Sequence, residues 1–368
     1  SAGPIWSGPL GPNPEPIAWN DEGGVFQWQF PHDQRGVEDV TMVRAPVATS
    51  GSLVFVPLAG GPSRNGVAAI DAAASAESSP PALWVVKTRN PVLISPAATE
   101  DLVFFVDGQG GDEERYLHCV RIEDQQRAWR VPVVSAASGM FRVGPEGVVV
   151  QDQLNSVQFL SLDGKSLWQK NVGTLSRTLL LVRQHVCLVT GDQGATIHLL
   201  ATGNGDPIAR RSIEGNITAD PVLLGDRLFV GTDKALIALD LSDKHPLRIS
   251  RTVNTQVAGE IAFSETHLAF ASGDGMICAI DRQSLEIVAE FPGGQPVYAP
   301  LISEERLLWI GADGLYQASL SASDEAPALW ADLSWLGTPA TSPVMYRKCL
   351  YVGIPKWGLV RFGLNAGG

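Results

Sequence analysis

The side chains suited to acid–base, nucleophilic or metal chemistry are dispersed along this chain. No two histidines have the short spacing of a zinc site, and the sequence has no Cys-x-x-Cys pair. The Gly-x-Ser-x-Gly pattern of a nucleophile elbow is also missing. The sequence therefore predicts no catalytic, cofactor-binding or metal-ligating residue, and each histidine is interpreted as an ordinary strand or surface residue. The six histidines are His32, His118, His185, His198, His245 and His267.

The four cysteines lie far apart in the sequence. They are Cys119, Cys187, Cys278 and Cys349. The internal repeat described below places each of them in a different repeat, two on second strands and two on third strands. Because residues in separated repeats cannot reach the Cα distance of a disulfide, we expect four free thiols that pack as small hydrophobes.

The charge of the chain bears on its partners. The formal net charge is −12, and such a surface repels phosphate backbones, so nucleic-acid binding is not expected. The best basic cluster, Lys244, His245, Arg248 and Arg251, is interpreted as a solvated loop. No apolar run approaches the ~18 residues that cross a bilayer, so we expect no membrane-spanning segment.

A short apolar run that ends in a hydrogen-bond acceptor recurs eight times, at intervals of 38 to 52 positions. A period near 40, filled with strand-like segments, is typical of β-propeller blades. Eight repeats of about 46 residues use the whole length of the chain, so we expect one propeller rather than several domains. The sequence thus predicts an all-β, eight-bladed β-propeller of four-stranded antiparallel blades. The runs end at Asp71, Glu123, Asp163, Thr202, Asp240, Asp281, Ser321 and Asn365.

The outer strand of several repeats carries a tryptophan. These residues are Trp84, Trp129, Trp168 and Trp330, with Ala209, Leu247 and Ile287 assigned to the same place in other repeats. A ligand-stacking role is possible in principle, but a large ring that recurs at one blade position is better explained by packing between neighbouring blades.

The last repeat lacks an outer strand of its own, because only three residues follow Asn365. The segment 24–30, with Trp28 in the recurrent tryptophan position, is predicted to supply it. The other strands of that blade are expected at 343–345, 348–352 and 358–364. A propeller closed by its N-terminal strand leaves no open sheet edge.

The repeat resembles that of pyrroloquinoline-quinone-type propellers. The resemblance rests on the turns 191–194, 272–275 and 311–314 and on the segment 162–168, and it covers about residues 21 to 368. In that family the dehydrogenases bind quinone and calcium at the ring centre, beneath a disulfide between adjacent cysteines. This chain has no adjacent cysteines and no large insertions between blades. It is more similar to the non-catalytic propeller subunit of the bacterial outer-membrane barrel-assembly machinery, which implies that it is not an enzyme and binds no cofactor.

The chain is expected to have two parts. Residues 1–20 contain five prolines and are predicted to be either a disordered leader or an extended strap; residues 21–368 form the propeller. Two long loops, 60–65 and 112–115, mark either a partner-facing rim or neutral insertions.

Two functions remain open from the sequence. The favoured one is a non-catalytic scaffold, a monomeric ring that binds a protein partner through loops on one face. The alternative is an enzyme with a site at the ring centre, either a quinone-dependent dehydrogenase or a hydrolase. The resemblance favours an extracytoplasmic location, periplasmic or membrane-associated, whereas four unpaired cysteines are compatible with the cytoplasm.

Overall fold

The computed structural model of the chain is built from β-strands. It describes residues 24–30, 43–60, 64–73, 82–108, 115–133, 141–153, 156–172, 176–182, 185–190, 194–242, 246–293, 298–303, 306–311, 313–322, 325–335, 337, 339–347, 349–355 and 357–364. Among these residues no helix is long and apolar enough to span a membrane. The predicted Pro-rich extension, residues 1–20, and parts of both long loops lie outside the described residues.

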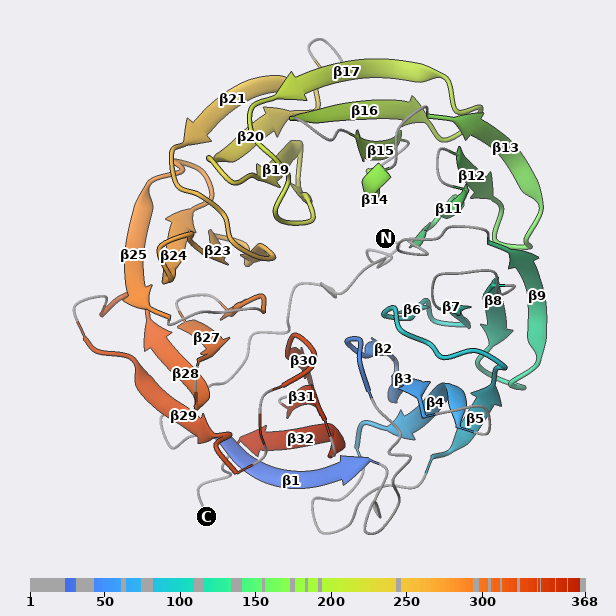
Figure 1. Ribbon diagram of the computed structural model, residues 1–368, viewed down its shortest axis with the longest axis horizontal. Helices are drawn as coiled ribbons and strands as arrows, with labels where there is room; N and C mark the ends of the chain where they lie inside the picture. Colours follow the sequence, from blue (N-terminus) through green and yellow to red (C-terminus); the bar gives the residue numbers. More distant parts are fainter. Residues whose placement is uncertain are drawn as a thin grey trace. The chain divides into compact units, whose positions relative to one another are not determined.

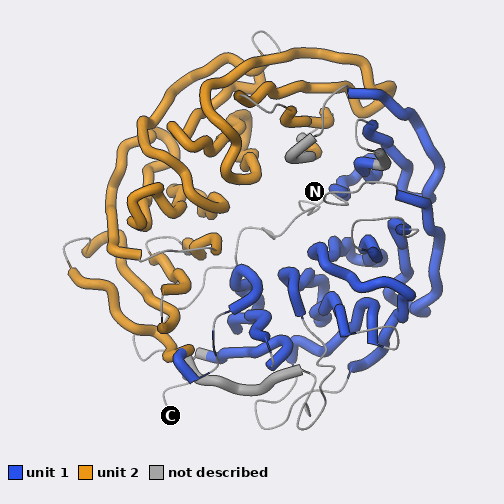
Figure 2. The backbone as a smooth tube through the Cα atoms, viewed as in Figure 1, with its two compact units in different colours: residues 1–173, 334–368 blue, residues 174–333 orange. Residues whose placement is uncertain are grey.

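The described strands pair into eight four-stranded antiparallel sheets (Figure 1). Seven sheets take four strands that are consecutive in the chain, and the eighth combines the last three strands with the first. This arrangement confirms the prediction of an eight-bladed β-propeller with four-stranded antiparallel blades. The chain divides into two compact units of four blades each, shown in blue and orange in Figure 2.

Unit 1 comprises Ser1–Gly173 and Ser334–Gly368. Its blades have the strand orders β2-β3-β4-β5, β6-β7-β8-β9, β10-β11-β12-β13 and β1-β32-β31-β30. The strands are β1 (Gly24–Phe30), β2 (Ala48–Ser50), β3 (Leu53–Ala59), β4 (Asn65–Asp71), β5 (Trp84–Lys87), β6 (Ala97–Ala98), β7 (Leu102–Asp107), β8 (Tyr116–Arg121), β9 (Arg127–Pro132), β10 (Phe141–Gly144), β11 (Gly147–Gln153), β12 (Ser156–Leu160), β13 (Ser166–Asn171), β30 (Val344–Tyr346), β31 (Cys349–Ile354) and β32 (Gly358–Leu364).

Unit 2 comprises Thr174–Leu333. Its four blades each take four consecutive strands, from β14 to β29. The strands are β14 (Ser176–Val182), β15 (His185–Thr190), β16 (Ala195–Ala201), β17 (Pro207–Ile213), β18 (Val222–Leu224), β19 (Arg227–Gly231), β20 (Leu236–Asp240), β21 (Arg248–Val253), β22 (Ala262–Phe263), β23 (His267–Ala271), β24 (Met276–Asp281), β25 (Ile287–Pro292), β26 (Leu301–Ser303), β27 (Arg306–Ile310), β28 (Gly314–Ser319) and β29 (Ala328–Asp332).

Burial along the strands follows their place in the blade. Second strands such as β7 and β19 are buried on both faces, because neighbouring blades cover each side, and their sequences are accordingly continuous apolar runs. Outer strands such as β9 and β13 are largely exposed, with single half-buried or buried residues between exposed ones. The core therefore lies between blades, for example where Phe55 and Val67 of one blade pack with Val103 and Phe105 of the next.

The blade that joins the two ends of the chain forms as the sequence predicts. Strand β1 runs antiparallel to β32, with Gly24 opposite Leu364 and Phe30 opposite Leu359, and a bulge interrupts the register between Phe26 and Trp28. The second strand of this blade begins at Cys349 and continues to Ile354, two residues beyond the predicted range.

The outer-strand tryptophans pack inside the structure, which confirms the packing interpretation. Trp129 lies 5.9 Å from Phe104 by ring centroids, and its Nε1 donates a 2.8 Å hydrogen bond to the carbonyl of Leu162 in the next blade. Gly164 of that blade lies directly beneath the ring: a Cβ there would be 2.7 Å from the indole. Trp129 therefore joins two blades of unit 1. Similarly, Trp84 lies 5.8 Å from Phe55, and Trp168 stacks on Phe159 at 5.6 Å.

Two of the equivalent positions were assigned wrongly from the sequence. Leu247 precedes β21 and has a positive φ of 62°, and Ile287 is 41% exposed. Trp129 lies opposite Cys119, and the residues at the matching register positions are Arg251, opposite Ala238, and Ala289, opposite Ala279. The assignment was therefore four residues early in β21, where the preceding turn is longer, and two residues early in β25.

Candidate functional site

The residues that could perform chemistry are spread over different blades. His118, His185, His198 and His267 lie on strands β8, β15, β16 and β23, whereas His32 and His245 lie outside the described residues. Within the described part of the chain, no three His, Cys, Asp or Glu side chains gather in a way that could hold a metal ion.

The four cysteines are buried free thiols on the strands predicted for them. Burial raises the pKa of Cys119, Cys187 and Cys278 to about 12. Thiols with so high a pKa are protonated at neutral pH and are poor nucleophiles. These three residues therefore act as core hydrophobes.

One histidine–carboxylate pair was not anticipated from the sequence. His118 Nε2 lies 3.1 Å from Asp107 Oδ1, and the side chains are 2% and 5% exposed. The imidazole stacks on Phe105 at 4.9 Å, and the same carboxylate oxygen accepts a 2.9 Å hydrogen bond from the backbone amide of Tyr116. A pair buried this deeply inside a blade offers no approach to a substrate, so we assign it to fixing β7 against β8.

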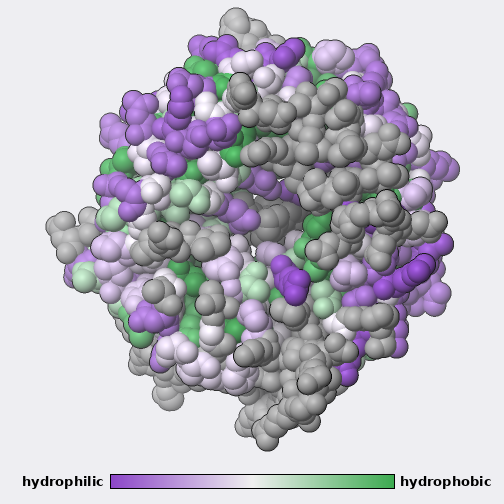
Figure 3. All heavy atoms as spheres, viewed as in Figure 1, coloured by the Kyte–Doolittle hydropathy of each residue, from purple (hydrophilic) through white to green (hydrophobic). Residues whose placement is uncertain are grey.

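The basic cluster predicted in a solvated loop lies partly on a strand. Arg248 and Arg251 belong to the outer strand β21, where both are exposed, and Arg248 Nη2 pairs with Asp240 Oδ2 at 2.8 Å. Lys244 and His245 lie outside the described residues. On the face shown in Figure 3, hydrophilic residues gather over β21 and β25, in agreement with the exposed arginines of β21.

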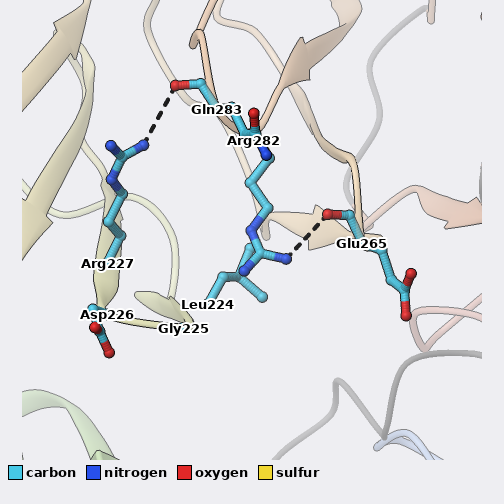
Figure 4. Close-up of a pocket in the computed structure, with 7 residues that line it drawn as sticks. All are labelled: Leu224, Gly225, Asp226, Arg227, Glu265, Arg282 and Gln283. Atoms are coloured by element: carbon cyan, nitrogen blue, oxygen red, sulfur yellow. Dashed lines mark hydrogen bonds between the residues drawn. The ribbon is translucent and has the colours of Figure 1, made fainter.

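A surface pocket of about 510 Å³ lies between two adjacent blades of unit 2. Its walls come from three turns: β18–β19, β22–β23 and β24–β25 (Figure 4). In an antiparallel blade the first-to-second and third-to-fourth turns lie at the same end, so these three turns share one face. The lining residues are Leu224, Gly225, Asp226, Arg227, Glu265, Arg282 and Gln283.

Two arginines line the pocket, one from each blade. Arg227, from the blade of β18–β21, donates from Nη1 to the carbonyl of Gln283 in the other blade at 3.4 Å. Arg282 donates from Nη1 to the carbonyl of Glu265 at 3.1 Å, and its Nη2 reaches within 3.5 Å of where a Cβ on Gly225 would lie. Figure 4 shows both guanidinium groups against main-chain carbonyls, while the Asp226 and Glu265 carboxylates point away from them. Arg227 thus links the two blades, Arg282 bonds within its own blade, and both side chains remain at the surface.

Carboxylates behind the pocket are held in their charged form. The hydrogen bond from Arg248, opposed in part by burial, lowers the pKa of Asp240, whose Oδ1 also lies 3.7 Å from Arg227 Nε. The pKa of Asp281 is lowered mainly by the backbone amide of Ser284, which donates to Oδ1 at 2.7 Å. Asp281 thereby fixes the turn that carries Arg282 and Gln283.

The composition of the lining indicates what the pocket can bind. Leu224 is its single aliphatic residue, against two arginines and two carboxylates. Small-molecule sites are mostly apolar with a few polar groups, whereas arginine is enriched where proteins meet proteins. The pocket is therefore suited to hydrogen bonding with a polar protein segment.

Sequence reasoning did not single out Arg227 or Arg282. Both follow an aspartate in a turn, as Gly225-Asp226-Arg227 and Asp281-Arg282 in successive repeats. This shared Asp-Arg pattern could have pointed to the two arginines. Only the structure shows that the β18–β19 turn of one repeat meets the β24–β25 turn of the next.

Comparison with known proteins places the chain as follows. A family model described as outer membrane protein assembly factor BamB matches residues 15–250. That match includes the β18–β19 side of the pocket and ends before the β22–β25 side. No curated protein sequence matches the chain.

Solved structures share the fold at low sequence identity. BamB from Moraxella catarrhalis superposes with a TM-score of 0.64 at 15% identity, over 89% of this chain and 98% of that one. The computationally designed Ika8 protein gives a TM-score of 0.69 at 13% identity, over 92% and 99% of the two chains. Saccharomyces cerevisiae Sqt1 gives 0.67 at 12% identity, over 89% and 97%. At these identities the likeness concerns the fold alone.

Proposed function

The chain belongs to the family of the outer membrane protein assembly factor BamB, and from this membership we propose that it is a non-catalytic scaffold that binds a protein partner. The binding face is the end of the unit 2 blades where the turns β18–β19, β22–β23 and β24–β25 meet. The family description concerns outer membrane protein assembly; for this chain the proposal extends to a protein partner and leaves its identity to experiment.

The observation that carries the proposal is the arginine-lined pocket on that face. Arg227 and Arg282 are oriented by main-chain carbonyls at 3.4 and 3.1 Å. Side chains held in place before binding lose little conformational freedom when a partner docks. Arginine, once positioned, is among the residues that dominate binding energy at protein interfaces.

The alternative of a quinone-dependent enzyme is less well supported. Such a site needs a tryptophan that stacks on the cofactor near the centre of the propeller. The recurrent tryptophans lie instead on outer strands, where Trp84, Trp129 and Trp168 pack against phenylalanines of their own blades. These rings are therefore engaged in blade packing.

The test is quantitative affinity capture from cells that express the chain. Wild type is compared with the double variant Arg227→Ala/Arg282→Ala and with the matched control Arg210→Ala/Arg211→Ala. The control removes the same charge from exposed positions on the outer strand β17, outside the pocket. The proposal expects a protein that is retained by wild type and by the control and is lost from the pocket variant. If every captured protein is retained equally by all three, the proposed binding face is wrong; thermal unfolding of each variant separates loss of binding from loss of fold.

A further inference from the structure

Two tryptophans form an exposed aromatic pair in unit 1. Trp335 lies in the segment that leads to β30, and Trp357 lies in the turn between β31 and β32. Their ring centroids are 5.2 Å apart, with the planes at 88°. Trp335 is 50% exposed, and Trp357 is partly exposed.

Trp335 differs from the other large exposed hydrophobic residues of the described chain. Those residues, among them Leu83, Leu167, Ile208 and Leu329, lie on or beside outer strands. Trp335 lies in a connection between strands and pairs with a second indole. An edge-to-face indole pair presents two aromatic surfaces at an angle, which is a shape that proline rings and extended backbone fit.

The pair is carried by firmly held backbone. The amide of Trp357 donates to the carbonyl of Ile354 at 3.0 Å, which closes the β31–β32 turn. The segment that follows Trp335 is bound to β31: Ala340 donates to the carbonyl of Gly353 at 2.7 Å, and Gly353 donates to Thr341 Oγ1 at 2.8 Å. Gly353 and Thr341 are closely packed, since a Cβ on Gly353 would lie 2.7 Å from Thr341 Cγ2. The two indoles are thus fixed relative to the same strand.

The chain itself contains a segment with the matching chemistry. Prolines occur at positions 4, 9, 12, 14 and 16, and Pro-x-Pro-x-Pro at 12–16 favours the polyproline II conformation. Proline-rich segments of this kind dock on aromatic-lined surfaces because their backbone loses little entropy on binding.

The position of β1 makes the contact possible. Gly24 pairs with Leu364 and Phe30 with Leu359, so the chain that precedes β1 starts at the end of the blade opposite Trp357. Running back along the seven residues of β1 requires about 23 Å. The eight residues from Pro16 to Gly24 span about 25 Å when extended. Pro16 and the prolines before it can therefore reach the level of the β31–β32 turn.

From this pair, its support and the reach of the chain we infer that Trp335 and Trp357 bind the chain's own proline-rich segment, residues 4–16. The segment acts as a strap along the blade that contains β1. The sequence leaves two alternatives for residues 1–20, a disordered leader and an extended strap. The inference chooses the strap and names Trp335 and Trp357 as its docking surface.

The experiment is site-specific photocrosslinking in the full-length protein. The photoreactive residue p-benzoylphenylalanine replaces Trp335, and in a matched control it replaces Leu167, which is 52% exposed on the outer strand β13. After irradiation, peptides joined to each position are identified by mass spectrometry. The inference expects a cross-link from position 335 to residues 4–16 and none from position 167.

A second variant separates this contact from chance proximity. With Pro12→Ala and Pro14→Ala in the same chain, the cross-link at position 335 should be lost while the melting temperature stays unchanged. A cross-linked dimer would assign the surface to a second copy of the chain and overturn the inference. Cross-links from position 335 only to other parts of the chain, or a cross-link that survives the proline substitutions, would also overturn it.

Discussion

Replacing Trp129 with alanine should destabilise unit 1 far more than replacing an exposed residue of an outer strand. The indole packs on Phe104, covers Gly164 and donates a hydrogen bond to Leu162 of the neighbouring blade. Truncation of a buried tryptophan costs about 3–5 kcal/mol. Because Trp129 is only half-buried, we expect about 3 kcal/mol, a large part of the ~5–15 kcal/mol that stabilises a typical domain.

The conservative variant Trp129→Phe divides this effect into two parts. Phenylalanine keeps most of the contact with Phe104 but cannot donate to the Leu162 carbonyl. Loss of one hydrogen bond typically costs ~0.5–1.5 kcal/mol, so Trp129→Phe should retain more than half of the stability that Trp129→Ala loses.

The assay is urea unfolding followed by far-UV circular dichroism, with Leu167→Ala as the control. Leu167 is 52% exposed on the outer strand β13, and substitutions at such surface positions usually change the free energy of unfolding by less than about 0.5 kcal/mol. If Trp129→Ala unfolds at the same urea concentration as Leu167→Ala, Trp129 does not join the blades and the reasoning is refuted.

Four further predictions concern the turns, the shared blade, acid and cofactor binding. Gly164 has a φ of +83°, so Gly164→Ala should cost about 1–2 kcal/mol of stability for the left-handed backbone alone, in addition to the clash with Trp129. The control is Gly203→Ala, which has open space around the added Cβ, and equal unfolding midpoints of the two variants would contradict the prediction. Deletion of residues 24–30 uncovers β32 and should abolish the cooperative thermal transition, so a deletion variant that melts like wild type would disprove the role of β1. The pKa of Asp281 is lower in the folded protein than the ~3.9 of an unfolded chain, so the ionised carboxylate stabilises the folded state above pH ~3.9. This stabilisation is lost as the pH falls through the pKa of the folded protein. In Asp281→Asn the free energy of unfolding should therefore decrease less on acidification, and an unchanged acid dependence would contradict this. Calorimetric titration with pyrroloquinoline quinone and calcium should give only heat of dilution, whereas saturable heat at one site would favour the enzyme alternative.

The architecture could be predicted because the same sequence pattern occurs eight times along the chain. Each second strand is a short apolar run between turn residues, and such a run is typical of a strand that is buried on both faces. The contribution of residues 24–30 to the last blade was also predicted, and β1 pairs with β32 as expected. The register of two outer strands was assigned wrongly: Leu247 and Ile287 come four and two residues before Arg251 and Ala289, which strand pairing places opposite Ala238 and Ala279.

The pocket could not be predicted in the same way. Arg227 and Arg282 are 55 positions apart in the sequence, and each looks like an ordinary charged residue after a turn. Their bonds to the carbonyls of Gln283 and Glu265 depend on main-chain atoms, which carry no sequence signature. The His118–Asp107 pair was missed for a related reason, since nothing in the spacing of the two residues indicates that both side chains are buried.

The most direct test of the scaffold proposal is a binding titration between the purified chain and the partner identified by capture. The proposal predicts saturable binding to wild type, unchanged binding to Arg210→Ala/Arg211→Ala, and binding at least about tenfold weaker to Arg227→Ala/Arg282→Ala, as expected when interface arginines that dominate the binding energy are removed. Equal affinity of the partner for all three proteins would contradict the assignment of the pocket as the binding face.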